Sequence, residues 1–406
     1  MLDSISTRSS AIQSAPISTT ENSANKTDIS TPSYYGRSSG ADSAVAIPVP
    51  GLENPNPIFN SAAISPDFDG DGKDDKFWRN SQTGEVAIWF MNGREVRSSD
   101  FVKNADGSNR TMGADWDFRI ADFNGDNKTD VLWRNKSTGE NVVWLMDGTT
   151  IASEASLAQL GPEWTASIAD FNGDKKTDVL WRNTNTGENS VWLMDGTTVT
   201  TPASLETTDT NWTANIVDFN GDAKTDILWR NQATGENTLW TMDGTNATAS
   251  ALPTLGSEWE ATFGDFDLNY QTDVLWRNKT TGENKLWLIN GGNVGTEAVL
   301  PTLEGAGWKP LIGDFDGNGK TDILWSNQET GQNKVWLMDG ANVVSETERD
   351  APSAAWIPSI GDFDGDGRTD IFSRNYETGE NAIVTIDSTD PQPSTLPTLG
   401  KEWYTF

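Results

Sequence analysis

The sequence predicts an all-β protein, a seven-bladed β-propeller preceded by a flexible N-terminal leader. Three observations support this prediction. An acidic nine-residue pattern occurs seven times, successive copies begin 47 to 55 residues apart, and β-branched and aromatic runs alternate with Asp-Gly, Asn-Gly and Thr-Gly turns. Repeats of about 40 to 50 residues with about four strands each are typical of propeller blades.

Composition limits the chemistry that this chain can perform. Its 406 residues include no Cys and no His, which excludes disulfides, Cys/His zinc sites and nucleophilic sites that need a His base. The net charge of −31 argues against nucleic acid or an anionic membrane as partner, because either would require a basic face. No apolar run reaches the length of about 18 residues that membrane insertion needs. The acidic surface favours cations.

The first part of the chain differs from the rest. Residues 1–57 are rich in Ser, Thr, Asn, Ala and Pro and show no periodicity, so we expect a flexible leader or linker there. Its first residues lack the apolar core of a secretory signal, and no cleaved signal peptide is expected. Residues 58–406 are assigned to the propeller.

Each repeat has the same internal order, which the third copy illustrates. WTASIADF leads into the acidic loop, TDVLWRN follows it, TNTG forms a turn, and ENSVWLMDG precedes a stretch rich in Thr, Ser and Ala. Strand and turn signals in this order predict three or four strands per unit. The acidic patterns begin at Asp67, Asp122, Asp170, Asp218, Asp265, Asp314 and Asp362.

Tryptophan occupies three fixed positions in nearly every unit, and these positions account for all 19 Trp when Trp403 is included. Such rings could stack on sugars, or they could fill the space between blades, where both faces of a sheet are buried. Recurrence at fixed positions favours packing between blades. A few exposed ring edges remain available to a ligand.

The C-terminal segment suggests how the ring closes. LPTLGKEWYTF at the end of the chain copies LPTLGSEWEATF, which begins at Leu252, and the first unit has Ser61 where the others have Trp. We therefore expect the tail to dock on the first unit and supply the missing ring through Trp403. Residues 61–64 compete for the same place.

Two units depart from the common pattern. The sixth has Ser326 and Gln332 where the others have Arg in WRN or SRN and Glu in TGE. In the seventh, we assign Phe372 and Val384 to the two strand-Trp positions. Joint loss of Arg and Glu suggests that they face each other across a hairpin as an exposed ion pair, as Arg182 and Glu188 would in the third unit. Such a pair is worth little, about 0–1 kcal/mol.

The acidic pattern D-x-[DN]-x-[DN]-x-x-x-D predicts a calcium loop. Oxygen-bearing side chains stand at positions 1, 3, 5 and 9, and a tight loop lets them converge together with the backbone carbonyl of position 7. Calcium binds about six to eight such oxygens, whereas magnesium demands a smaller octahedron and retains water. Solvated Asp-Gly turns are the alternative, but they would tolerate other residues at these positions.

The predicted ligands follow from this spacing. The side-chain ligands are Asp67, Asp69, Asp71, Asp75, Asp122, Asn124, Asp126, Asp130, Asp170, Asn172, Asp174, Asp178, Asp218, Asn220, Asp222, Asp226, Asp265, Asp267, Asn269, Asp273, Asp314, Asp316, Asn318, Asp322, Asp362, Asp364, Asp366 and Asp370. The backbone carbonyl ligands belong to Lys73, Lys128, Lys176, Lys224, Gln271, Lys320 and Arg368.

Up to seven calcium ions are expected, one per unit, with unequal affinities. Position 6 is Gly in the first, sixth and seventh units, where a positive φ costs little, and a larger residue elsewhere. The fifth unit, DFDLNYQTD, also lacks the position-4 Gly. It is predicted to be the weakest site.

These loops, each followed by a strand of the DVLWRN type, resemble the FG-GAP and VCBS repeats of seven-bladed calcium propellers. That group includes the integrin α-subunit headpiece and secreted microbial lectins. The Gly-Ala-Pro element is missing from these units, so the closer resemblance is to the bacterial VCBS type. The resemblance implies calcium at positions 1, 3, 5 and 9, an extracellular or surface-attached location, and a role in adhesion or in glycan or protein recognition.

The leading hypothesis is a non-enzymatic, calcium-stabilised recognition or adhesion module, similar to lectins, whose ligand is a glycan or a protein. The alternative is a structural or assembly component, tethered by the leader to a surface complex or to further copies of itself. An enzyme acting on glycans through paired carboxylates is a third possibility. No catalytic residue is assigned, because the regularly placed carboxylates are committed to metal.

Overall fold

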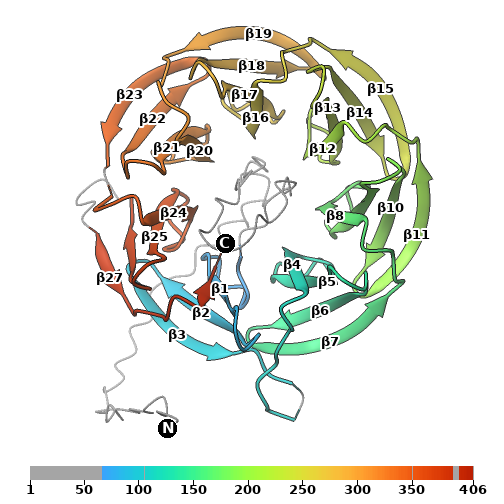
Figure 1. Ribbon diagram of the computed structural model, residues 1–406, viewed down its shortest axis with the longest axis vertical. Coiled ribbons are helices and arrows are strands. Elements are labelled where there is room, and N and C mark those ends of the chain that lie inside the picture. Colours follow the sequence, from blue (N-terminus) through green and yellow to red (C-terminus); the bar gives the residue numbers. More distant parts are fainter. Residues whose placement is uncertain (1–65, 105, 350, 387–392, 406) are drawn as a thin grey trace, which may run out of the picture. The chain divides into compact units, whose positions relative to one another are not determined.

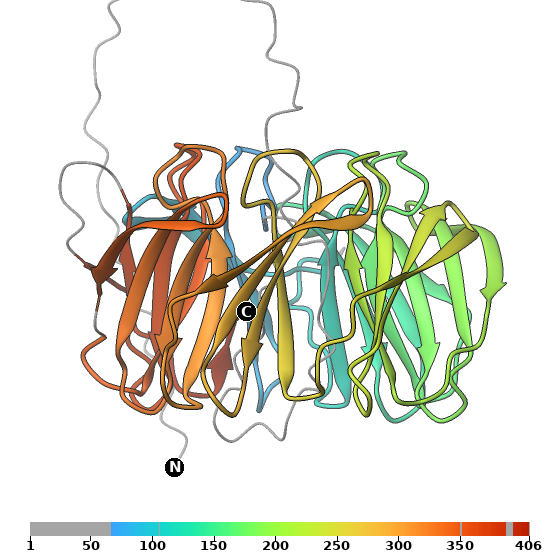
Figure 2. The same ribbon diagram turned by 90° about the horizontal axis from the view of Figure 1, so that it is seen from above.

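The computed structural model describes residues 66–104, 106–349, 351–386 and 393–405. These residues contain no helix, and their strands form seven antiparallel four-stranded sheets that surround a common centre as propeller blades (Figure 1). Figure 2 shows this ring edge-on, with the strands of each blade running between its two faces. The all-β, seven-bladed prediction is confirmed. The expected leader, residues 1–57, lies outside the described residues.

Every blade uses its strands in the same radial order. The innermost strands are β28 (Trp403–Tyr404) in blade 1, then β4 (Trp116–Ala121), β8 (Trp164–Ala169), β12 (Trp212–Val217), β16 (Trp259–Gly264), β20 (Trp308–Gly313) and β24 (Trp356–Gly361) in blades 2 to 7. The second strands are β1 (Lys76–Asn80), β5 (Asp130–Asn135), β9 (Asp178–Asn183), β13 (Asp226–Asn231), β17 (Asp273–Asn278), β21 (Asp322–Asn327) and β25 (Asp370–Asn375).

The outer half of each blade is a hairpin. Its third strands are β2 (Val86–Asn92), β6 (Asn141–Asp147), β10 (Asn189–Asp195), β14 (Asn237–Asp243), β18 (Asn284–Asn290), β22 (Asn333–Asp339) and β26 (Asn381–Val384). The rim strands are β3 (Glu95–Phe101), β7 (Thr150–Leu157), β11 (Thr198–Leu205), β15 (Asn246–Leu252), β19 (Asn293–Leu300), β23 (Asn342–Glu348) and β27 (Ser394–Leu396). None of the described segments is a helix long and apolar enough to span a membrane.

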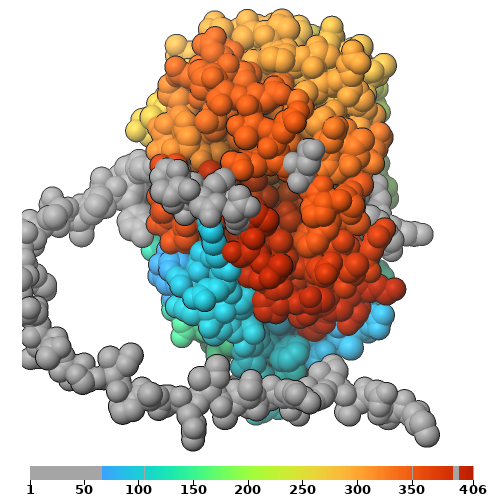
Figure 3. Space-filling model, turned by 90° about the vertical axis from the view of Figure 1, so that its left-hand side faces the viewer, coloured from blue at the N-terminus to red at the C-terminus, as the bar shows by residue number. Residues whose placement is uncertain are grey.

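The C-terminal segment closes the ring as expected. In β28, Trp403 pairs with Asn80 and Tyr404 with Arg79 of β1, the register that Trp116 and Asn135 show in blade 2 (Figure 1). Trp403 also packs against the apolar cluster between blades 7 and 1. The first and last blades consequently lie side by side, blue-cyan beside red, on the side of the molecule shown in Figure 3. The competing residues 61–64 lie outside the described part of the chain.

The apolar core is divided among the junctions between blades. Seven clusters of buried side chains occur among the described residues, and each combines residues of two neighbouring blades. Trp of the second and third strands are at most 7% exposed and stack in pairs, as Trp181 and Trp192 do with ring centroids 5.2 Å apart. These rings therefore fill the space between blades. Several innermost-strand Trp, including Trp164, remain partly exposed.

The predicted ion pair between Arg182 and Glu188 is wrong. Arg182 is buried, and its guanidinium donates to the Asn189 side chain at 2.9 Å and to the Asp209 carbonyl at 2.8 Å. It also lies over the ring of Trp229 in the next blade, 4.9 Å from the centroid. Glu188 instead accepts a hydrogen bond from the Thr186 hydroxyl. Arginine here therefore joins two blades.

This arrangement explains why blades 6 and 7 depart from the pattern together. Arg374 lies over Trp78 as Arg182 lies over Trp229, so the arginine position of one blade faces the second-strand ring of the next. The assignment of Phe372 to a Trp position is wrong, because Ser373 pairs with Pro358 as Trp181 pairs with Ala166, and Phe372 packs in the cluster between blades 7 and 1. By the same geometry, Ser326 of blade 6 faces Ser373 of blade 7. Loss of the cation accompanies loss of the indole, the aromatic ring that attracts cations best.

Candidate functional site

Seven acidic loops, each directly preceding the second strand of its blade, lie at the same end of the blades. The first aspartate of each loop holds the turn together. In blade 3, the Asp170 carboxylate accepts backbone N–H groups from Gly173 at 2.7 Å, Asp174 at 3.2 Å and Lys175 at 2.7 Å. Charged acceptors make strong hydrogen bonds. Position 1 therefore fixes the loop in the coiled form that the spacing predicted.

The loop conformation requires positive φ at positions 4 and 6. Gly173 has φ 76° and Lys175 has φ 65°. All the non-glycine residues with positive φ in the described chain occupy such positions in these loops: Asn127, Lys175, Ala223, Leu268 and Tyr270. Residues other than glycine are strained at positive φ, and such strain is concentrated at functional sites. The chain thus retains one loop geometry even where the sequence opposes it.

The last aspartate of each loop is buried and ties the loop to the blade. Asp178 is 0% exposed, and its carboxylate accepts the backbone N–H of Phe171 at 3.0 Å and of Met194 at 2.8 Å. Burial raises the pKa of Asp178 to about 7 despite these hydrogen bonds, and the nearby charges of Asp170 and Asp174 raise it further. A divalent cation would favour the ionised carboxylate.

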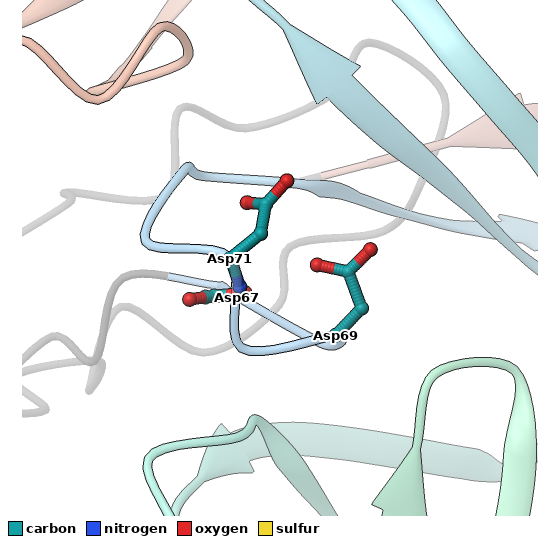
Figure 4. Close-up of side chains that lie close together, drawn as sticks. All are labelled: Asp67, Asp69 and Asp71. Carbon is teal, nitrogen blue, oxygen red and sulfur yellow. The ribbon is translucent and has the colours of Figure 1, made fainter. Parts of the chain in front are cut away.

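Carboxylates converge in four of the loops. In each, three carboxylate oxygens from different residues lie within 4.8 Å of one another. The four groups are Asp67, Asp69 and Asp71; Asp265, Asp267 and Asp273; Asp314, Asp316 and Asp322; and Asp362, Asp364 and Asp366. Figure 4 shows the first group, in which the Asp69 and Asp71 carboxylates point to the same side of the loop.

Two carboxylate oxygens support a fit to a cation. Oδ1 of Asp69 and Oδ1 of Asp267 are buried and have no hydrogen-bond partner within the described residues. A buried, unpaired carboxylate oxygen is costly unless an ion or a donor satisfies it. Both belong to position 3, a predicted ligand, in blades 1 and 5. An all-oxygen donor set of this kind suits a hard cation such as calcium.

In the loops of blades 2, 3 and 4, the side chain at position 3 has a hydrogen-bond partner within the loop. There the residue is Asn, and its amide nitrogen donates to the position-5 carboxylate, as Asn172 does to Asp174 at 3.1 Å. The predicted side-chain ligands of these loops are therefore brought together by hydrogen bonds. The carbonyl ligands at position 7 and the lowest affinity at blade 5 stay predictions.

Sequence reasoning missed the cations around these loops. Lys176, at position 7, donates from its ammonium to Asp195 at the end of the third strand, and four such Lys–Asp pairs occur in the described chain. The constant spacing of 19 residues could have revealed them. Arg97 contacts Asp69 and, at 3.2 Å, Asp71. It has no equivalent cation in the other units, so no repeated signal marked it.

Two surface grooves flank the end of β11 and offer a different kind of site. One has a volume of about 280 Å³ and lies on blade 3, where Trp164 meets the polar side chains of Glu188, Asn189, Ser190 and Thr207. The other has about 260 Å³ and lies between β11 and blade 4, lined by residues that include Glu206, Trp240 and Asn246. Each combines an indole with hydrogen-bonding groups.

These features define a β-propeller whose blades each carry an acidic loop. The chain belongs to the FG-GAP-like repeat family, whose model matches residues 67–133, 122–181, 170–229, 265–325 and 314–373. This result confirms the resemblance seen in the sequence. No curated protein matches the chain.

Solved structures support the fold. A structure described as the basis of specific recognition of non-reducing terminal N-acetylglucosamine by an Agrocybe aegerita lectin is 15% identical, with a TM-score of 0.64 over 80% of this chain and 90% of that chain. BBS1N in complex with ARL6DN is 9% identical, with a TM-score of 0.51 over 82% of this chain and 96% of that chain. At these identities the likeness shows the fold alone.

Proposed function

We propose that the protein is a calcium-stabilised recognition module without catalytic activity, which binds carbohydrate outside the cell or at its surface. The observation that carries the proposal is the repetition in all seven blades of one loop with positive φ at positions 4 and 6 and oxygen-bearing side chains at positions 1, 3, 5 and 9, with converging carboxylates in four of these loops. Repeated loops of this kind suit a structural ion in each blade, because binding to the folded state alone stabilises that state. Calcium is abundant outside cells, which motivates the proposed location.

The grooves beside β11 are the proposed carbohydrate sites. Aromatic faces stack on sugar rings, and neighbouring amides, hydroxyls and carboxylates select among their hydroxyl groups. The groove on blade 3 offers this combination in Trp164, Asn189 and Glu188. The structure of the Agrocybe aegerita lectin, described as recognising terminal N-acetylglucosamine, makes N-acetylglucosamine-terminated glycans the first candidates.

Calcium removal tests the first half of the proposal. Protein treated with EDTA and then dialysed should release heat on titration with calcium, and millimolar calcium should raise its melting temperature by about 10 °C or more. Magnesium at the same concentration should raise the melting temperature far less, because it demands a smaller octahedron and gives up its water reluctantly. Absence of both heat and stabilisation with calcium would refute the calcium role.

A glycan array in calcium tests the second half. We expect binding to glycans with terminal N-acetylglucosamine, and a loss of about tenfold in affinity in Trp164→Ala, since one stacked ring contributes about 1–2 kcal/mol. Trp212→Ala is the matched control, because Trp212 begins the innermost strand of blade 4 and is likewise partly exposed but does not line either groove. Silence across the array with intact protein would count against a lectin.

A further inference from the structure

Backbone hydrogen bonds link the acidic loops to one another around the whole ring. In every blade the residue at position 8 of the loop donates its N–H to the carbonyl of the position-1 aspartate in the preceding blade, at 2.6 to 2.9 Å. The bond from Thr225 to Asp170 is 2.7 Å long, and the bond from Asp74 to Asp362 joins the first blade to the last. No loop of the ring is therefore held by its own blade alone.

Side chains reciprocate this bond at three junctions. The Asp170 N–H donates to the Thr225 hydroxyl oxygen at 3.2 Å, and the Asp122 N–H does the same to Thr177. Where the ring closes, position 8 is Asp74, and its carboxylate accepts the Asp362 N–H at 2.8 Å. The residue type changes at this junction, but a side-chain oxygen of position 8 still accepts the position-1 N–H.

A second backbone contact braces the next residue of the loop. At five junctions the Gly that follows the third strand donates its N–H to the carbonyl of the position-2 Phe in the preceding blade. Gly244 donates to Phe171 in this way at 2.9 Å. The carbonyls of Asp170 and Phe171, at positions 1 and 2 of the blade 3 loop, thus both accept hydrogen bonds from blade 4.

We propose that each metal site is completed across a blade junction, with position 8 of one blade acting as a positioning residue for the site of the preceding blade. This inference depends on the proposed calcium binding. Position 1 supplies a predicted ligand whose carboxylate already organises the loop. Fixing its backbone before the ion arrives lowers the ordering cost of binding, as supporting hydrogen bonds do for other metal ligands. An ion in one blade then also tightens the junction with the next.

Thr225→Val tests the proposal, because it removes the hydroxyl acceptor and keeps the backbone N–H. Calcium is titrated while the amide resonances of Gly173 in blade 3 and Gly221 in blade 4 are followed by NMR. The midpoint read at Gly173 should rise about three- to tenfold, the effect of one lost hydrogen bond. The midpoint at Gly221 should change little, although Thr225 belongs to the same loop as Gly221.

Two controls separate positioning from general destabilisation. Thr225→Ser keeps the acceptor and should restore the wild-type midpoint at Gly173. Thr234→Val lies in the same blade, where the hydroxyl of Thr234 bonds within its own turn to Glu236, and it should leave both midpoints unchanged. Should Thr225→Val fail to fold, Thr177→Val read at Gly125 examines the same bond between blades 2 and 3.

The possible outcomes are distinguishable. A calcium response in wild-type protein with the same Gly173 midpoint in Thr225→Val would overturn the proposal and leave calcium binding intact. A shift confined to Gly221 would overturn it as well. If no loop resonance of the wild type responds to calcium, the proposed calcium role fails and this inference fails with it.

Discussion

Lys76 and Asp74 of the first blade differ from the residues at the same positions in the other blades. Lys76 takes the place that Val131 and Val179 occupy in blades 2 and 3, is 2% exposed, and donates to the Ser359 hydroxyl at 2.7 Å. Burial lowers the pKa of Lys76 to about 7, although the charge of Asp74 opposes the shift. A buried, charged pair of this kind adds little stability relative to apolar residues of similar size.

The double substitution Lys76→Val with Asp74→Thr, which restores the residues of blade 3, should therefore stabilise the protein. We expect a gain of about 1–3 kcal/mol in the free energy of unfolding at pH 7, measured by urea denaturation. Lys76→Val alone should gain less or lose stability, because it leaves Asp74 buried without its cation. Equal effects of the single and double variants would contradict this account.

The pH dependence of the stability gained by the double variant follows from the lowered pKa of Lys76. Between pH 7 and the ordinary lysine value of 10.5, the folded chain binds fewer protons at Lys76 than the unfolded chain. The stability of the wild type therefore rises with pH in this window relative to the variant. The advantage of the double variant should be largest at and below pH 7 and should shrink toward pH 9.

At the scale of the strand, the arginine that follows the second-strand Trp binds two blades together. Arg182 is buried and hydrogen-bonded to a side chain and to carbonyls beyond its own strand, and it contacts Trp229. Arg182→Ala should cost about 2–4 kcal/mol, because it leaves buried acceptors without donors. Arg182→Lys should not avoid this loss of stability, since an ammonium cannot reproduce the fork of donors or the stacking on Trp229.

Glu188→Ala provides the matched comparison, because sequence reasoning paired Glu188 with Arg182. Glu188 bonds only within its own turn among the described contacts, and a surface change of this kind is worth about 0.5 kcal/mol or less. Urea denaturation of both variants decides between the two accounts. Equal losses would favour the ion pair after all, whereas a large loss in Arg182→Ala alone supports the junction.

This error shows where sequence reasoning fails. Strands, turns and loop spacing were predictable, because each depends on neighbours within one unit and the pattern is repeated seven times. The partner of Arg182 belongs to the next unit, and no local pattern distinguishes it from Glu188. Arg97 was missed for a related reason, since it approaches Asp69 from the rim strand of its blade and occurs once.

The candidate site was predictable to the same extent. The repeated spacing located the first and last aspartates at the two ends of each loop, and the positive φ that the structure shows at position 6 was expected from the sequence. The contribution of the next blade was not, because the bond from Thr225 to Asp170 joins residues 55 positions apart. Only the closed ring brings such residues together.

For the whole molecule, stability depends on closing that ring, which a short C-terminal segment does. β28 pairs with β1 through Trp403 and Tyr404, the Tyr404 hydroxyl accepts from Arg79 at 2.8 Å, and Arg374 donates to the Trp403 carbonyl at 2.8 Å. The segment thus holds both blades at the closure. Without it, blade 1 would lose its innermost strand and the cluster containing Trp78 would be opened to water.

Deletion of residues 400–406 should lower the free energy of unfolding by about 4 kcal/mol or more, from lost hydrogen bonds and one exposed indole. Trp403→Ala in the full chain should cause an intermediate loss, since it keeps the backbone pairing with β1. Tyr404→Phe, which removes only the hydroxyl that Arg79 contacts, should cause the smallest. Thermal melts of the four proteins should therefore form an ordered series, and a melting curve unchanged by the deletion would show that the ring is closed by other contacts.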